Sequence, residues 1–106
     1  MSETIVLIDD DPIIAKGWAE AAVPAGINLI TYLSPLVFLE NASLFHKTVR
    51  IYIDSDLDQV KKGEEWAQDF FKLGFKNIHL LLAYDFDQKR DIPSFVEEVI
   101  SKAPPF

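Results

Sequence analysis

The sequence predicts an α/β protein built on a doubly wound, parallel, five-stranded sheet. Two apolar runs, residues 4–8 and 49–53, carry this prediction, because short unbroken β-branched runs are typical of strands buried on both faces of a parallel sheet. Such runs also alternate along the chain with segments of helical spacing, which is the pattern of consecutive β-α units. With 106 residues the chain is long enough for one core, and we expect a single domain over residues 1–106.

The first three strands are expected over residues 4–9, 27–32 and 49–54, and the second of them has the weakest signal. The helix after the first strand begins at Pro12, a residue favoured in a first helical turn, and ends near Gly26. The next helix is capped by Ser34 and opened by Pro35, with apolar core candidates as far as Phe45.

The second half of the chain continues the same alternation. A helix that contains Trp66 closes at Gly74, because glycine commonly ends helices. The fourth strand is expected over residues 78–83. Residues 96–101 form a short fifth strand, or they are the end of a helix that begins at Pro93.

The composition limits the class of protein. Hydrophobic residues make up 49% and charged residues 25% of the chain, a balance typical of soluble globular proteins. The net charge of −7 argues against nucleic acid or an anionic membrane as the main partner. Because the chain has no cysteine, no apolar stretch long enough to cross a bilayer and no secretory signal pattern, we expect a cytoplasmic protein.

Carboxylates follow two of the predicted strands. Asp9, Asp10 and Asp11 come after the first strand, and Asp54 closes the third. Because ligands of open parallel sheets bind at the carboxyl ends of the strands, we expect Asp9, Asp10 and Asp54 to meet at one edge. Clustered carboxylates repel one another unless a cation lies between them, and oxygen ligands suit a hard cation, so we predict a Mg²⁺ site. Asp11 is the expected N-cap of the following helix.

Several short motifs occur in a characteristic order along the chain. They are the acidic run at residues 6–12, Asp54, Gly63-Glu64-Glu65, residues 81–85, and Lys102 followed by Pro104 and Phe106. In order and spacing these motifs resemble the receiver domain of two-component response regulators, which has a flavodoxin-like fold. The resemblance covers nearly the whole chain.

The resemblance implies a role for each acid. Asp54 is the expected phosphoryl acceptor, and the donor would be a histidine kinase or a phosphotransfer protein. Mg²⁺ is the expected cofactor, held by Asp10, Asp54 and the backbone carbonyl of Asp56, while Asp9 supports the metal through water. Lys102 would place a positive charge beside the phosphoryl oxygens.

Two positions depart from the receiver pattern. The fourth strand of the family ends in a threonine or serine, where this chain has Leu82, or Ala83 if the alignment shifts by one. An aromatic residue usually lies three positions before the lysine, where this chain has Val99. We therefore expect the two side chains that normally transmit phosphorylation to be missing.

The segment between the fourth and fifth strands predicts a reduced fourth helix, because residues 84–93 show no apolar period of helical spacing. Nothing follows Phe106 in the sequence, so no fifth helix is expected. Loss of these helices would expose apolar surface along one flank of the sheet. We expect this flank to form a homodimer or to dock on another protein.

The leading hypothesis is a stand-alone, atypical response regulator receiver domain, which would be a signalling module and not an enzyme. Two versions remain open: Asp54 takes a phosphoryl group in a phosphorelay, or the chain is a pseudo-receiver that acts by protein–protein interaction alone. The alternative is a small Mg²⁺-dependent phosphotransfer or phosphohydrolase enzyme. In that case Asp54-Ser55-Asp56 would resemble the Asp-x-Asp centre of haloacid-dehalogenase-type or Toprim enzymes.

Overall fold

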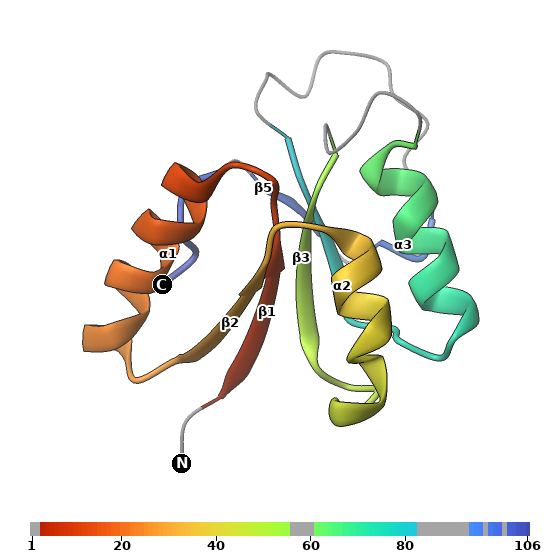
Figure 1. Cartoon of the computed structure of the whole chain (residues 1–106), viewed down its shortest axis with the longest axis horizontal. Helices are drawn as coiled ribbons and strands as arrows, with labels where there is room; N and C mark the ends of the chain where they lie inside the picture. The colour runs from red at the N-terminus through yellow and green to blue at the C-terminus, as the bar shows by residue number, and fades with distance from the viewer. Residues whose placement is uncertain (1–2, 56–60, 83–93, 97, 101) are drawn as a thin grey trace.

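The computed structural model describes residues 3–55, 61–82, 94–96, 98–100 and 102–106 (Figure 1). Helices and strands alternate along the chain. They are β1 (Thr4–Ile8), α1 (Pro12–Ala25), β2 (Asn28–Tyr32), α2 (Pro35–Glu40), the 3-10 helix η1 (Ala42–Leu44), β3 (Arg50–Asp54), α3 (Gly63–Lys72), β4 (Ile78–Leu81) and β5 (Glu98–Ile100).

All the strands pair in parallel, and their order across the sheet is β2-β1-β3-β4-β5. β1 and β3 are neighbours, with Ile8 opposite Ile53, so their carboxyl ends lie level with each other. Every side chain from Ile5 to Ile8 is buried, which explains why β1 is apolar without alternation. The predicted parallel α/β architecture is confirmed.

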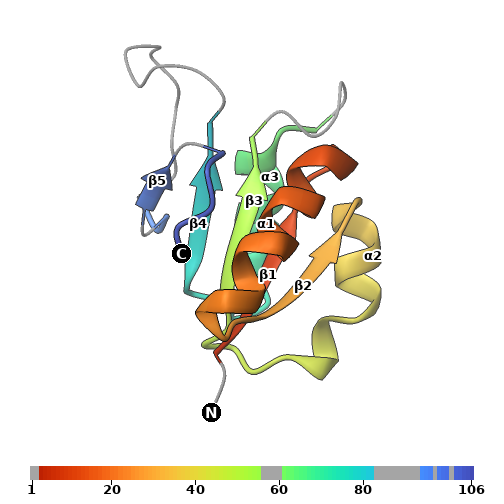
Figure 2. The same ribbon diagram turned by 90° about the vertical axis from the view of Figure 1, so that its left-hand side faces the viewer.

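Helices cover both faces of this sheet (Figures 1 and 2). α1 packs on one face around Trp18, whereas α2 and α3 pack on the other face around Phe38 and Phe70. The C-terminal segment lies on the α1 side, where Phe106 contacts the ring of Trp18. The two apolar cores hold β1 and β3 between them, so the edge where these strands end has a rigid support.

The second helix is shorter than the sequence indicates. α2 ends at Glu40, where the side chain of Asn41 donates a hydrogen bond to the Val37 carbonyl oxygen at 2.8 Å and the 3-10 helix follows. This bond satisfies a carbonyl of the last helical turn, as Asn side chains often do at helix ends. Phe45 nevertheless reaches the core, where its ring stacks on Phe38 with 5.7 Å between centroids.

The strand at the far edge is also shorter than predicted. β5 has three residues, compared with the predicted strand over residues 96–101, and pairs with β4 through Leu80 opposite Val99. The described residues 102–106 after it form no helix. The prediction of a reduced fourth helix concerns residues 84–93, which lie outside the described part of the chain.

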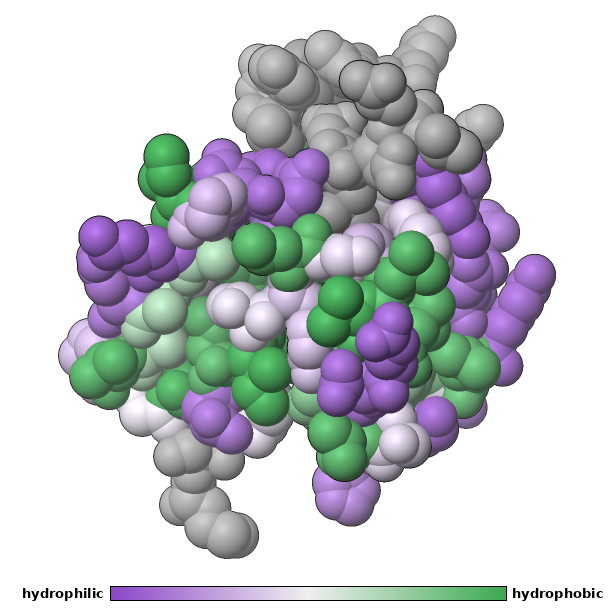
Figure 3. All heavy atoms as spheres, in the orientation of Figure 1, coloured by the Kyte–Doolittle hydropathy of each residue, from purple (hydrophilic) through white to green (hydrophobic). Residues whose placement is uncertain are grey.

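Large apolar side chains that remain exposed lie on the helices and their connections, as far as the described residues show. They include Leu33, Leu36, Val37 and Leu44, in α2 and its flanks. Figure 3 shows apolar side chains interspersed with polar ones over the face of the molecule that carries α2. The flank after β4 depends largely on residues 83–93, outside the described ranges, so the homodimer stays a prediction. Within the described ranges, no helix is both long and apolar enough to cross a membrane.

Candidate functional site

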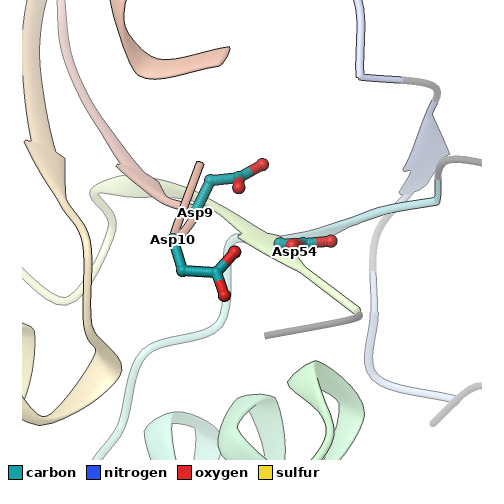
Figure 4. A group of neighbouring side chains, drawn as sticks. All are labelled: Asp9, Asp10 and Asp54. Carbon is teal, nitrogen blue, oxygen red and sulfur yellow. The ribbon is translucent and has the colours of Figure 1, made fainter. Parts of the chain in front are cut away.

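Three carboxylates meet at the carboxyl edge of the sheet (Figure 4). Asp9 directly follows β1 and Asp54 ends β3, so the pairing of these two strands places the side chains next to each other. Asp9, Asp10 and Asp54 each offer an oxygen, and these oxygens lie within 4.8 Å of one another. Asp9 and Asp54 are only 1% exposed, whereas Asp10 is open to solvent. The acids converge as the sequence indicates, and their chemical role stays a prediction.

Lys102 lies between two of these acids. Its Nζ is 3.1 Å from Oδ2 of Asp9 and 3.0 Å from Oδ2 of Asp54. The Lys102 side chain is 20% exposed, so part of it reaches solvent beside Asp9, Asp10 and Asp54, and these four side chains make up what we call the pocket. Lys102 is 93 residues from Asp9 in the chain, and the parallel order of the strands brings them together.

Burial and charge set the acid–base properties of the pocket. Burial raises the pKa of Asp9, and so does the Asp54 charge, against the lowering effects of the Asp11 amide and Lys102. Burial and the Asp54 charge also raise the pKa of Asp10. Burial alone would lower the pKa of Lys102, but its contacts with Asp54 and Asp9 outweigh burial and raise it. One ammonium therefore leaves an excess of negative charge, which favours binding of a further cation.

The donor set of the pocket suits a hard divalent cation. The three side chains supply carboxylate oxygens, the ligands that Mg²⁺ prefers. Because Asp10 is exposed, one side of the cluster is open to water, and Mg²⁺ usually retains several water ligands. Asp10 and Asp54, with Asp9, would hold the ion. The predicted carbonyl ligand from Asp56 lies outside the described residues.

The loop after β1 holds Asp9 in a fixed orientation. The Asp11 backbone N–H donates to Oδ1 of Asp9 at 2.9 Å, and the Ile13 N–H donates to Oδ1 of Asp11 at 2.9 Å. Asp11 is thus the N-cap of α1, as predicted. The start of α1 therefore orients one oxygen of Asp9, while the other oxygen faces Lys102.

Gly63 brings α3 directly against the end of β3. Its N–H donates to the Ser55 carbonyl oxygen at 3.1 Å. A Cβ at this position would lie 2.0 Å from the Asp54 carbonyl oxygen, far inside van der Waals contact. The absence of a side chain is therefore what allows α3 to pack against the residue that ends the acidic strand.

The structure also locates one of the departures from the receiver pattern. Leu82 is 5% exposed and belongs to the apolar core under α2 and α3. A leucine there fills the core and offers no hydrogen bond to a group on Asp54. The other alignment, with Ala83, and the side chain of Val99 lie outside what the structure describes.

One contact to the pocket has no signal in the sequence. The indole Nε1–H of Trp18 on α1 donates to the backbone carbonyl oxygen of Lys102 at 2.9 Å. From its helical spacing Trp18 is predicted to be a core aromatic, and it is buried, but its polar partner is 84 residues away. A hydrogen bond between such distant residues leaves no periodic or local pattern that could reveal it.

Asp10→Asn is expected to raise the free energy of unfolding of the metal-free protein by about 0.5 kcal/mol at pH 7, a small value because solvent screens this exposed group. The reason is that the folded pKa of Asp10 lies above its ordinary value of 3.8, so ionisation opposes folding. Below that value the carboxyl is protonated and costs nothing, and the cost appears as pH rises through the folded pKa. Urea unfolding of Asp10→Asn and the wild type at pH 7 and at about pH 3 measures the difference.

Glu20→Gln is the control for this prediction, because it removes the same charge from an exposed position of α1. Mg²⁺ should stabilise the wild type and Glu20→Gln, but it should have little effect on Asp10→Asn. If Asp10→Asn is less stable than the wild type at pH 7 without metal, repulsion within the acid cluster is not the dominant effect.

Several solved structures share this fold. A CheY-like receiver domain from Methylobacillus flagellatus matches with a TM-score of 0.77 and 14% identity, over 100% of this chain and 89% of that chain. The chemotaxis response regulator CheY4 of Vibrio cholerae matches with a TM-score of 0.72 and 20% identity, over 100% and 89% of the two chains. The N-terminal domain of a response regulator/sensory box/GGDEF three-domain protein from Carboxydothermus hydrogenoformans matches with a TM-score of 0.76 and 16% identity, over 94% and 82%.

These likenesses show that the chain has the receiver-domain fold. At identities of 14% to 20% they show the fold alone. No protein-family model matches the sequence, and no curated protein matches it. The predicted resemblance to receiver domains is confirmed at the level of three-dimensional structure.

Proposed function

We propose that the chain is a receiver domain that accepts a phosphoryl group on Asp54, with Mg²⁺ as cofactor. The observation that carries this proposal is the Lys102 ammonium held between Asp9 and Asp54, with Asp10 beside them. A carboxylate nucleophile, a cluster of oxygen ligands for a cation and a fixed positive charge are the groups that phosphoryl transfer to an aspartate needs.

Transfer to Asp54 forms one bond and breaks one. A carboxylate oxygen of Asp54 attacks the phosphorus of a phosphohistidine, or of a small phosphodonor, and the product is an acyl phosphate. The bond from phosphorus to the leaving nitrogen or oxygen breaks, and the leaving group takes a proton from water. Mg²⁺ held by Asp10, Asp54 and Asp9 would neutralise charge on the phosphoryl oxygens.

Lys102 would exchange one partner during this step. Its ammonium contacts carboxylate oxygens of Asp9 and Asp54 before transfer. When Asp54 becomes an acyl phosphate, its carboxylate loses its charge, and the charged phosphoryl oxygens then attract the ammonium, while Asp9 can remain the second partner of Lys102. The raised pKa of Lys102 keeps the side chain charged at neutral pH.

The output of such a domain would differ from that of a receiver with the usual hydroxyl. Leu82 is part of the core and cannot bond a phosphoryl oxygen. If the chain is instead a pseudo-receiver, it should gain no phosphoryl group from a phosphodonor. The enzyme alternative based on Asp54 and Asp56 is not favoured, because the similar structures named above are receiver domains.

The expected donor is a histidine kinase or a phosphotransfer protein, and the expected location is the cytoplasm. The only support for this donor and this location is the receiver-domain fold. The net charge of −7 argues against nucleic acid as a partner, since an acidic protein repels the phosphate backbone.

A small phosphodonor with Mg²⁺ is expected to add one phosphoryl group to the wild type, as measured by intact mass. Asp54→Asn should gain none, because the nucleophilic carboxylate is gone. Asp69→Asn is the matched control: this carboxylate lies on α3, pairs with Lys61 and is outside the acid cluster, so its gain should equal that of the wild type. No gain in the wild type, or an equal gain in Asp54→Asn, would remove the proposal and favour the pseudo-receiver.

A further inference from the structure

Trp18 connects α1 to the lysine that bridges the acids. Its indole N–H donates to the Lys102 carbonyl oxygen at 2.9 Å, and Nζ of the same lysine lies 3.0 Å from Asp54. Trp18 is 1% exposed, so water cannot readily replace this acceptor. A buried donor without its partner is costly, which makes the hydrogen bond a firm restraint on the main chain at Lys102.

The ring of Trp18 is itself held from two directions. It makes an edge contact with Tyr52 of β3 at 5.1 Å and with Phe106 at 5.6 Å, measured between ring centroids. β3 ends in Asp54, and Phe106 belongs to the same C-terminal segment as Lys102. Trp18 therefore contacts both the strand that supplies Asp54 and the segment that supplies Lys102.

We propose that Trp18 is a positioning residue for Lys102, and that it fixes the lysine main chain so that the ammonium reaches Asp54 and the phosphoryl group formed there. This inference rests on the proposed phosphorylation of Asp54. The strand before Lys102 has only three residues, so it offers few main-chain hydrogen bonds to hold the segment. A hydrogen bond from a 14-residue helix provides the additional fixed point.

The hydrogen bond from Trp18 to Lys102 could transmit phosphorylation to α1 without the hydroxyl that the family carries where this chain has Leu82. Movement of the ammonium toward a phosphoryl group would change the surroundings of the Lys102 carbonyl oxygen and of the Trp18 indole that donates to it. Trp18 packs α1 onto the sheet through the core that also contains Leu7 and Leu81. Phosphorylation of Asp54 should therefore alter the face of the sheet that α1 covers, where the C-terminal segment also lies.

Trp18→Phe is expected to slow phosphorylation from a small phosphodonor on the order of fivefold, as for the loss of one hydrogen bond. Phenylalanine keeps an aromatic ring near Tyr52 and Phe106 but has no N–H donor. Trp66→Phe is the matched control, because Nε1 of Trp66 is buried and has no hydrogen-bond partner among the described residues. Mg²⁺ affinity should not fall in either variant, since the acids hold the metal and Lys102 does not.

Two results of this comparison would overturn the inference. One is a phosphorylation rate in Trp18→Phe equal to that of the wild type while Lys102→Met is slow. The other is a parallel loss of Mg²⁺ affinity, which would mean that the variant disturbs the whole pocket.

In the Lys102→Met background, Trp18→Phe should cause no further loss of rate, because its effect passes through the ammonium. A fivefold loss that persists there would also contradict the proposal.

The Trp18 indole N–H provides a readout that does not depend on phosphorylation. The chain has two tryptophans, so Trp66→Phe leaves Trp18 as the single indole signal in a ¹H–¹⁵N spectrum. This proton should exchange slowly, and its signal should shift in Lys102→Met but not in Lys16→Met, an exposed lysine of α1. If the wild type takes no phosphoryl group, the proposed function fails, and rapid exchange of the Trp18 indole proton with solvent would separately overturn the positioning role.

Discussion

Gly63→Ala is expected to lower the free energy of unfolding by about 3 kcal/mol, the upper part of the range for overpacking. The added Cβ would lie 2.0 Å from the Asp54 carbonyl oxygen and 2.7 Å from Cα of Ser55, and both are backbone atoms that cannot rotate away. Relief requires α3 to move away from β3, which also disturbs the hydrogen bond from the Gly63 N–H to Ser55. Urea unfolding monitored by circular dichroism measures the loss.

The same substitution should also disturb the pocket, because the backbone that must shift belongs to Asp54. We expect the folded fraction of Gly63→Ala to bind Mg²⁺ more weakly than the wild type. Gly17→Ala is the matched control: nothing lies within 4 Å of a Cβ at this position inside α1, and alanine in a helix should stabilise the protein by about 0.5–1 kcal/mol. Wild-type stability in Gly63→Ala would show that α3 is free to move without cost.

Lys102→Met is expected to lower the free energy of unfolding at pH 7 by about 2 kcal/mol, less than for a fully buried ion pair because the lysine is 20% exposed. Asp9 and Asp54 are buried and would face each other without the ammonium between them. Phosphorylation should slow by more than tenfold, on the order of the effect of removing one charge-stabilising group. Urea unfolding and the rate of phosphoryl gain by intact mass measure the two effects.

The destabilisation by Lys102→Met should depend on pH. Burial already raises the pKa of Asp9, and loss of the lysine contacts would raise it further. A carboxyl with a raised folded pKa costs nothing below its unfolded pKa of about 3.9, and its cost develops as pH rises through the folded pKa. The variant should therefore approach wild-type stability at about pH 3 and differ most at neutral pH.

Mg²⁺ should restore part of the lost stability of Lys102→Met at pH 7, because the ion supplies positive charge to the same acids. Lys16→Met removes an exposed lysine of α1 and should change stability by no more than about 0.5 kcal/mol. Equal stability of Lys102→Met and the wild type at neutral pH would mean that the ion pairs with Asp9 and Asp54 contribute nothing to folding.

The sequence was sufficient to predict the architecture of the sheet and the meeting of the acids. An unbroken apolar run buried on both faces, as at residues 4–8, has few interpretations other than an interior strand of a parallel sheet. Once two such strands are neighbours, level carboxyl ends follow from parallel pairing, and Asp9 and Asp54 must lie together. Capping of α1 by Asp11 was equally predictable, because it depends on residues adjacent in the chain.

Element boundaries were less predictable where local and tertiary preferences compete. The apolar residues after Ser34 suit a longer helix, but α2 ends at Glu40, and Phe45 packs on Phe38 from beyond the 3-10 helix. A hydrophobic pattern shows which residues enter the core, and it does not show whether the backbone between them is one helix or a helix and a turn.

By itself the sequence determined the parallel α/β fold and the position of a carboxylate cluster, because both follow from patterns within single strands and their ends. The family resemblance placed Lys102 near Asp54, but only the tertiary structure decided that its ammonium bridges Asp9 and Asp54. The tertiary structure also decided that Gly63 must lack a side chain and that Trp18 holds the Lys102 main chain. These contacts join residues far apart in the chain, and their distances depend on how helices pack against the sheet. No periodic pattern encodes that packing, so the residues that position the pocket become visible only in the folded chain.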